Sequence, residues 1–180
     1  MKINLGSGYK RIDGYLNVDH DPLTNPDFLV DIENENLPLE TNSVSHIVAH
    51  HILEHIGPNF FNVIKEMYRV SKPEAEWDIK FPHFRSDLQH MDPTHKRSLT
   101  VDQFMLFSKS YNRYHIQQWN SSSGFGLKLD VDMEVVKFKH NPLPHWEQKF
   151  QSMTQEEIDQ VADRFNNVFF ETHMIVRVIK

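Results

Sequence analysis

Short apolar runs separated by polar connections dominate the first half of the chain. Residues 59–71 instead space their apolar side chains at three- and four-residue intervals between Pro58 and Pro73, which predicts a helix. The other runs predict short β-strands, at residues 2–5, 15–18, 28–30, 44–49 and 76–81. Strands joined by helices or compact connectors favour a parallel sheet with layers on both faces, so we expect an α/β, doubly wound, Rossmann-like fold.

The second half of the chain follows a different pattern. Capping boxes that begin at Thr100 and Thr154 predict two helices, the first extending to about residue 108. Residues 109–126 are polar and aromatic and predict a loop, whereas residues 127–139 alternate and predict a strand or hairpin arm. Residues 169–179 also alternate, and we expect them to add an antiparallel strand to the mostly parallel sheet.

Composition narrows the classes of protein to be considered. The chain has 180 residues, no cysteine and a formal net charge of −6 at pH 7. No apolar run is long enough to span a bilayer, and the first residues enter a strand pattern without the apolar stretch of a secretory leader. The lack of cysteine fits a reducing compartment, so we expect a cytoplasmic protein. The negative charge, without a dense Lys/Arg cluster, argues against a nucleic-acid partner.

Three chemically distinctive features follow three of the predicted strands. Gly6-Ser7-Gly8 follows the first, where a turn without Cβ atoms lets backbone N–H groups approach a ligand. Asp19 ends the second strand, where a carboxylate can accept both hydroxyls of a ribose, and Asp31 ends the third, where it can receive an adenine amine. Each feature alone is also typical of an ordinary turn or strand end. Together they indicate a nucleoside site, because doubly wound sheets bind ligands outside the carboxyl ends of their strands.

The segment His51-Ile52-Leu53-Glu54-His55 matches the H-x-x-E-H pattern of some zinc peptidases, in which two histidines on one helical turn hold the metal. That interpretation requires a stable helix, but Gly57-Pro58 would end a helix there almost at once. It also requires a third ligand, and candidates such as Glu134 lie in strand-like sequence. A zinc hydrolase is therefore a remote alternative, and we assign no metal site.

Three stretches carry a resemblance to a known family: INLGSGYKRIDGYLNVDHDP, FLVDIENENLPLETNSVSHIVAHHILEHI and NVIKEMYRVSKP. They resemble class I S-adenosylmethionine-dependent methyltransferases, nearest to a short type-11-like group, in which Leu-Glu-His is frequent after the fourth strand. The resemblance is strongest over residues 2–82 and implies S-adenosyl-L-methionine as the cofactor. At matching positions it implies these cofactor-binding residues: Gly6, Ser7 and Gly8 at the methionine moiety, Asp19 at the ribose, His20, Asp31 and Ile32 at the adenine, and His50 by the sulfonium and carboxylate.

The chain departs from this family in two places. Lys72-Pro73-Glu74-Ala75 replaces the usual Lys-Pro-Gly-Gly, and no helix precedes the first strand. Closure of the pocket must then come from a later insertion or from a partner chain, such as a second copy in a homodimer. The expected organisation is a single methyltransferase domain over residues 1–180, with a cofactor-binding core (1–82), a substrate-side insertion (about 83–150) and a closing helix and strand (151–180).

The acceptor side is predicted from the histidines that follow the fourth and fifth strands. Methyl transfer to a hydroxyl or protonated amine is helped by a general base, and His95 and His83 are our candidate catalytic residues. Alternatively, these histidines only cap loops and helix ends, or His90, Asp92 and His95 hold a divalent metal. The resemblance implies a small-molecule or saccharide-type acceptor, and a non-catalytic nucleotide-binding module of the same fold is the alternative function.

Overall fold

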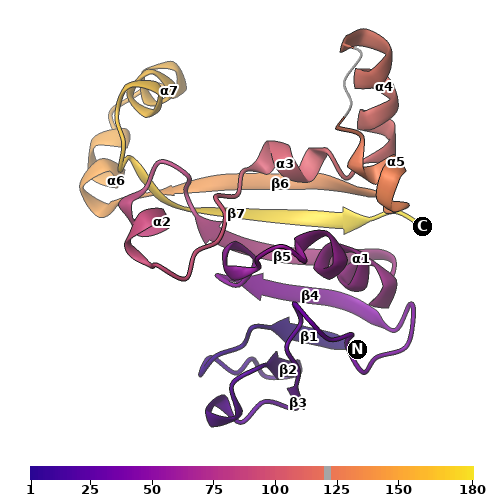
Figure 1. Cartoon of the computed structure of the whole chain (residues 1–180). Coiled ribbons are helices and arrows are strands. Elements are labelled where there is room, and N and C mark those ends of the chain that lie inside the picture. The colour runs from indigo at the N-terminus through magenta and orange to yellow at the C-terminus, as the bar shows by residue number, and fades with distance from the viewer. Residues whose placement is uncertain (120–122) are drawn as a thin grey trace.

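A seven-stranded mixed β-sheet forms the framework of the protein, in a computed structural model that describes residues 1–119 and 123–180 (Figure 1). The strands lie in the order β3-β2-β1-β4-β5-β7-β6. Neighbours among β1 to β5 pair in parallel, whereas β7 pairs antiparallel with both β5 and β6. The strands are β1 Lys2–Leu5, β2 Leu16–Asp19, β3 Phe28–Leu29, β4 Val44–His50, β5 Ser71–Pro82, β6 Met133–Pro142 and β7 Phe169–Val178.

The strand order reverses between β1 and β4, which is the topological switch point of a doubly wound sheet. The chain leaves β1 and β4 at the same edge of the sheet, since the two strands are parallel neighbours. This edge therefore carries the glycine turn after β1, Asp19 at the end of β2, and residues 51–55 after β4. The predicted Rossmann-like fold with an antiparallel closing strand is confirmed.

One face of the sheet packs against helices. α1 (Phe60–Val70) is the crossover between β4 and β5, and it buries the apolar stripe that predicted it. α3 (Val101–Met105) starts at the predicted capping box of Thr100 and buries Phe104. Both helices share one core with the alternate strand residues that face them, including Ile3, Ile47, Ala49, Trp77, Ile79, Met174 and Val176.

The opposite face of the sheet is polar, because successive strand residues point to opposite sides. It carries His46 and His50 on β4, Asp78 on β5, and His173 and Arg177 on β7. The connections between the first four strands, residues 6–15, 20–27 and 30–43, are described throughout and contain turns and one 3-10 turn (Pro22–Thr24) but no α-helix. The expectation of helical layers on both faces is therefore wrong around β1 to β4, where the connectors have no helical periodicity.

The departure from Lys-Pro-Gly-Gly has a clear structural counterpart. β5 begins at Ser71, earlier than predicted, and the register with β4 shifts between Val44 and His46. Glu74, at the first position where the family has glycine, adopts the left-handed conformation with φ +62°. The left-handed conformation that glycine adopts at little cost is thus adopted within β5 by a non-glycine residue, at some conformational cost.

The loop predicted over residues 109–126 is wrong. The chain forms α4 (Lys109–Trp119) and α5 (Phe125–Leu129), and residues 120–122 of that prediction lie outside the described part. β6 then begins only at Met133, so the strand predicted from residue 127 starts too early.

The remaining helices lie away from the centre of the sheet. α2 (Asp87–Met91) follows β5, and α6 (Pro144–Phe150) and α7 (Gln155–Arg164) connect β6 to β7 (Figure 1). Neither α6 nor α7 contains a buried residue, although α7 does begin at the predicted capping box of Thr154. Within residues 1–119 and 123–180, no helix is long and apolar enough to cross a membrane.

Candidate functional site

The glycine turn after β1 is held against the segment that follows β4. Gly6 has φ +62°, and a Cβ atom built there would lie 2.5 Å from Cγ1 of Ile52. Gly8 also has positive φ, and its N–H donates to Oδ2 of Asp19 at 2.7 Å. Ser7 between them is 6% exposed, and its Oγ has no hydrogen-bond partner. The turn therefore has a fixed shape and contains one buried hydroxyl group that makes no hydrogen bond within the protein.

Asp19 links the ends of β1 and β2. Its Oδ2 accepts from Gly8, and its Oδ1 accepts from the N–H of Asp21 at 2.9 Å. The side chain is 8% exposed. Each carboxylate oxygen has a further lone pair, so Asp19 can hold the glycine turn and still accept from a ligand hydroxyl.

A hollow of about 240 Å³ opens at this edge of the sheet. Of the eight residues predicted for the cofactor, five line it: Gly6, Asp19, His20, Asp31 and Ile32. The same hollow has other walls that the sequence did not predict, namely Val18, Val30, Glu33, Ile52, His55 and Ile56. Val30 and Ile56 are buried, which gives the hollow an apolar floor beside its carboxylates.

The missed wall residues had a signal in the sequence. Ile52 and Ile56 are four residues apart in the segment after β4, on either side of the Leu-Glu-His triplet. Leu53–His55 forms a single 3-10 turn, which turns Ile52 and Ile56 toward this hollow and Leu53 into the core. The absence of a longer helix agrees with the argument against a peptidase-type zinc helix.

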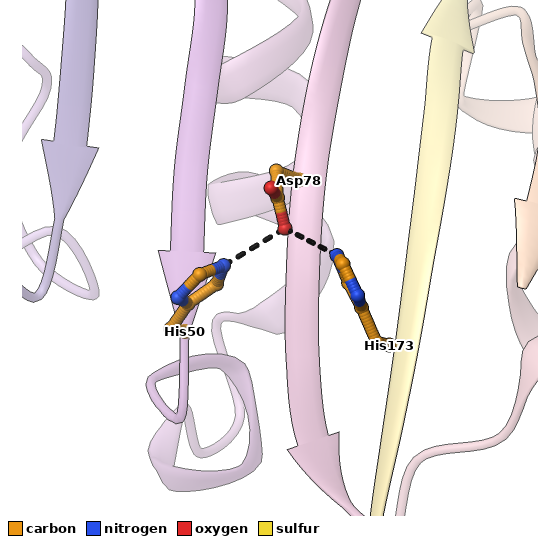
Figure 2. A group of neighbouring side chains, drawn as sticks. All are labelled: His50, Asp78 and His173. Atoms are coloured by element: carbon orange, nitrogen blue, oxygen red, sulfur yellow. Dashed lines mark hydrogen bonds and ion pairs between the residues drawn. The ribbon is translucent and has the colours of Figure 1, made fainter. Parts of the chain in front are cut away.

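His50, predicted near the sulfonium, lies on the polar face of the sheet. Figure 2 shows Asp78 between His50 and His173, with each imidazole directed at the carboxylate. The Nε2 atoms of both histidines lie 2.8 Å from Oδ1 of Asp78. Burial opposes the ionisation of Asp78, but the hydrogen bond and charge of His50 and the charge of His173 outweigh it and lower the pKa of Asp78. His50 is not among the residues that line the first hollow.

A second hollow, of about 580 Å³, adjoins the first. His55 lines both hollows and so forms part of the wall between them. The predicted base His95 lines the second hollow, and its side chain is 8% exposed. The full lining is His51, Glu54, His55, Pro82, Leu88, Met91, Asp92, Pro93 and His95.

Two loops meet at the wall of this second hollow. The backbone carbonyl of Glu54 accepts from the N–H groups of Lys96 and Arg97, so the turn after β4 is joined to the segment that contains His95. The rings of His55 and His95 meet edge to face, with their centroids 4.7 Å apart. Glu54 itself is fully buried, and neither of its carboxylate oxygens has a hydrogen-bond partner.

His51 lies between two carboxylates. Its Nε2 is 2.7 Å from Oε2 of Glu171, and its Nδ1 is 3.4 Å from Oε1 of Glu54, an ion-pair distance without hydrogen-bond geometry. The interaction with Glu54 raises the pKa of His51, burial opposes it, and Glu171 adds to the increase. His51 therefore has a stronger tendency to be protonated near neutral pH than an ordinary histidine.

His83 and His90, the other histidines named from the sequence, do not line either hollow. His83 is 7% exposed and packs against His140 and Phe169. Burial, with smaller contributions from the charges of His140 and Arg85, lowers the pKa of His83 to about 4. His90 is exposed on α2 and is not part of the metal-ligand clusters found among the described residues.

Comparison with known proteins identifies the family that this fold resembles. A family model described as a methyltransferase domain matches residues 16–76. The fold is that of class I methyltransferases. The resemblance to S-adenosylmethionine-dependent methyltransferases is thereby confirmed, and it implies S-adenosylmethionine as the cofactor. Among curated proteins, no significant sequence match is found.

Solved structures share the methyltransferase fold over nearly the whole chain. A SAM-dependent methyltransferase from Archaeoglobus fulgidus is 15% identical with a TM-score of 0.60, over 98% of this chain and 85% of that one. The YcgJ protein of Bacillus subtilis is 13% identical with a TM-score of 0.60, over 99% and 91%. The [4+2]-cyclase SpnF is 14% identical with a TM-score of 0.58, over 99% and 74%. At such identities the similarity establishes the fold alone.

The residues of the first hollow fit the implied cofactor. Asp19 has acceptor capacity for ribose hydroxyls, and Val30 and Ile56 offer apolar surface to an adenine ring. Carboxylates at this rim would not repel a ligand that carries a positive charge.

Proposed function

We propose that the protein transfers a methyl group from S-adenosylmethionine to a hydroxyl of a small-molecule or saccharide-type acceptor. The observation that carries this proposal is the pair of adjoining hollows with His55 in the wall of both. One hollow has the carboxylate and apolar floor suited to a nucleoside, and the other has a mixed polar and apolar lining suited to an acceptor. Donor and acceptor would then meet beside the side chain of His55. Holding the two reactants together in this way can lower the activation barrier by several kcal/mol.

The cofactor side is assigned to residues of β1 to β3. Asp19 would accept from the ribose, His20, Asp31 and Ile32 would border the adenine, and the turn Gly6-Ser7-Gly8 would face the methionine part. Bound S-adenosylmethionine supplies a methyl group on a positively charged sulfur, which keeps the bonding electrons as the methyl passes to the acceptor oxygen and the hydroxyl proton goes to a base. His50 is not carried forward as a cofactor ligand, because its imidazole binds Asp78.

His95 is the base that we propose on the acceptor side. It lines the second hollow, and its Nδ1 lies 2.9 Å from the carbonyl oxygen of Gln89, which can only accept. The Nδ1 atom must therefore carry the proton, which leaves Nε2 as an acceptor for a hydroxyl proton. His83 is less suited, because a pKa of about 4 makes it a weak base at neutral pH.

The lining of the second hollow supports a hydroxylated acceptor of modest size. Leu88, Met91 and Pro93 offer apolar surface, whereas the carboxylate of Asp92 and the ring of His95 offer polar groups. Sugar rings present alternating apolar and hydroxyl surfaces, and carboxylates and imidazoles accept from their hydroxyls. The chain's net charge of −6 gives no general attraction for nucleic acid.

An Asp19→Asn variant tests the cofactor assignment. Calorimetry should show S-adenosylmethionine binding to the wild-type chain and at least tenfold weaker binding to D19N, because an amide offers a single acceptor oxygen where two are needed. Asp13→Asn is the matched control, since Asp13 is an exposed carboxylate of the same connection between β1 and β2. Circular dichroism should show both variants folded. Equal affinity of D19N and wild type would refute the ribose assignment.

Turnover tests the reaction itself. The wild-type chain should produce S-adenosylhomocysteine with some member of a panel of sugars and small hydroxylated metabolites. Cofactor binding without product on any acceptor would favour the alternative, a nucleotide-binding module of the same fold. The fold does not by itself fix the reaction, since one protein with this fold, SpnF, is described as a [4+2]-cyclase.

A further inference from the structure

The burial of Glu54 is not explained by the proposed reaction. The residue has no exposed surface, and both carboxylate oxygens lack a hydrogen-bond partner. A carboxylate removed from water costs several kcal/mol unless it is paired and hydrogen-bonded. His51 approaches one oxygen, Oε1, but its Nε2 is already bound to Glu171. The second oxygen of Glu54 has no hydrogen-bond donor.

Two imidazoles lie beside this carboxylate. One ligand atom each from Glu54, His55 and His95 lies within 4.8 Å of the other two. They come from two segments: Glu54 and His55 lie on the turn after β4, and His95 lies on the segment after α2. The two segments are joined by the hydrogen bonds from the N–H groups of Lys96 and Arg97 to the carbonyl of Glu54. The cluster is therefore produced by the docking of two loops and is not a local feature of one sequence segment.

Both imidazoles are oriented by bonds at Nδ1. His95 donates through Nδ1 to the carbonyl of Gln89 at 2.9 Å. Nδ1 of His55 lies 2.9 Å from Oγ1 of Thr94, whose own hydroxyl lies 2.6 Å from Oδ1 of Asp92 and donates to it. The Thr94 oxygen thus accepts from His55. In both neutral rings Nε2 keeps its lone pair, which is the arrangement that outer hydrogen bonds give to metal-binding histidines.

We propose that Glu54, His55 and His95 form a binding site for a divalent transition-metal ion of the Zn²⁺ type. Two imidazole nitrogens and one carboxylate are a common donor set for zinc, with a fourth position left for a ligand. In tetrahedral sites the ligand atoms lie about 3.4 Å apart, and here they lie within 4.8 Å of one another, so these side chains would have to draw closer by no more than about 1.4 Å on binding. All three residues line the second hollow, so the open position would face it.

This site differs from both metal hypotheses of the sequence analysis. The peptidase pattern pairs His51 with His55, but His51 is bound to Glu171. The second hypothesis used His90, Asp92 and His95, and His90 is not in the cluster. The proposed site takes Glu54 and His55 from the first pattern and His95 from the second.

The chain also contains a second cluster of similar composition, His50, Asp78 and His173. There Oδ1 of Asp78 lies 2.8 Å from Nε2 of each histidine, so the groups satisfy one another without an ion (Figure 2). This cluster lies on the polar face of the sheet, and neither His50 nor His173 lines the cofactor or acceptor hollow. It therefore provides an internal control for the first.

A metal at Glu54, His55 and His95 would change how the acceptor is activated. The ion would bind the acceptor's hydroxyl oxygen and lower the pKa of that hydroxyl. His95 would then serve as a ligand and not as the base, and the hydroxyl proton would pass to water. This role rests on the proposed function, whereas metal binding does not.

Titration calorimetry with Zn²⁺ alone tests the site, on chain freed of metal by a chelator and without cofactor or acceptor. Wild type should bind one Zn²⁺ per chain, and Glu54→Gln and His95→Ala should each weaken binding at least tenfold. His173→Gln removes an imidazole from the second cluster and should bind as wild type does. Circular dichroism identifies any variant that fails to fold, and the near-isosteric E54Q keeps the test valid if H95A does not fold.

Two outcomes would overturn the proposal. One is a wild-type chain that does not bind Zn²⁺, and the other is binding that H173Q abolishes and E54Q retains. Because the titration contains no cofactor, it can succeed in a chain that transfers no methyl group, so failure of this site and failure of the proposed function are distinguishable. Full turnover by a chelated, metal-free chain would refute the activating role and return His95 to the role of base.

Discussion

Two individual histidines, His83 and His51, have pKa values shifted in opposite directions, so they affect the pH dependence of stability in opposite ways. His83 is buried with a pKa of about 4, so protons bind it more readily in the unfolded chain than in the folded one. Its contribution to stability is therefore lost as the pH falls from about 6.5 toward 4. His51 has a raised pKa, so its contribution is complete below about pH 6.5 and is lost as the pH rises through the folded-state pKa.

His83 allows a quantitative prediction. When the pH is lowered from 7 to 5, His83 should decrease the free energy of unfolding by about 2 kcal/mol, because its imidazole becomes protonated in the unfolded chain but stays neutral in the folded one. In His83→Gln the decrease in stability over this interval should be smaller by that amount, as measured by urea unfolding at the two pH values. His90→Gln, at an exposed histidine, should keep the wild-type difference. An H83Q difference as large as that of wild type would contradict the argument.

At the scale of elements, the glycine turn after β1 depends on its contact with Ile52. Gly6 and Gly14 both have positive φ, at +62° and +78°. A Cβ at Gly6 would meet Ile52 at 2.5 Å, whereas one at Gly14 would meet nothing within 4 Å. Gly14→Ala should therefore show only the backbone strain, about 1 kcal/mol, and Gly6→Ala should cost a further 1–3 kcal/mol by order of magnitude.

Chemical denaturation of the two glycine variants measures this difference. The added Ile52→Ala change should recover part of the loss in G6A and none of it in G14A, because only Gly6 touches Ile52. If both glycine variants lost the same stability, the contact with Ile52 would have no energetic weight.

Elements whose signal is local could be predicted from the sequence, and elements that depend on distant partners could not. The capping boxes at Thr100 and Thr154 and the apolar stripe of α1 are formed by residues close together in the sequence, so they can be recognised without knowledge of the fold. The fold of residues 109–119 depends on Asn112, whose side chain donates to the carbonyl of Leu106 and accepts from Leu127. Those bonds leave no periodic pattern in the sequence.

The candidate site divides in the same way. Gly6, Asp19 and Asp31 lie at or just after the ends of β1, β2 and β3, and parallel strands bring such positions to one edge, so their grouping around one hollow could be predicted. His50, the last residue of β4, points to the polar face and binds Asp78, and the sequence does not show to which side of the sheet the last residue of a strand points. The grouping of Glu54, His55 and His95 could not be predicted, since it requires the loop after β4 to dock on a segment about 40 residues later.

On the scale of the whole molecule, stability is concentrated around the sheet and α1. Val63 on α1 is 2% exposed, whereas Val161 on α7 is only half-buried, although both lie on the apolar stripe of their helix. Val63→Asp should place a charge in the core and prevent folding or cost more than about 3 kcal/mol. Val161→Asp should cost less than about 1 kcal/mol. Urea unfolding measures the loss of stability in the two variants. Equal losses would show that α7 contributes as much to the free energy of unfolding as α1 does.

The ten residues between β1 and β2 form turns where many dinucleotide-binding proteins begin a helix. Aligned peptide dipoles at the start of such a helix attract phosphate groups. Here that source of positive potential is missing, and Asp19, Asp31 and Glu33 stand at the rim instead. Nucleotides with a pyrophosphate, such as NAD or FAD, should therefore be rejected on electrostatic grounds, which leaves the cleft selective for a nucleoside that bears no phosphate.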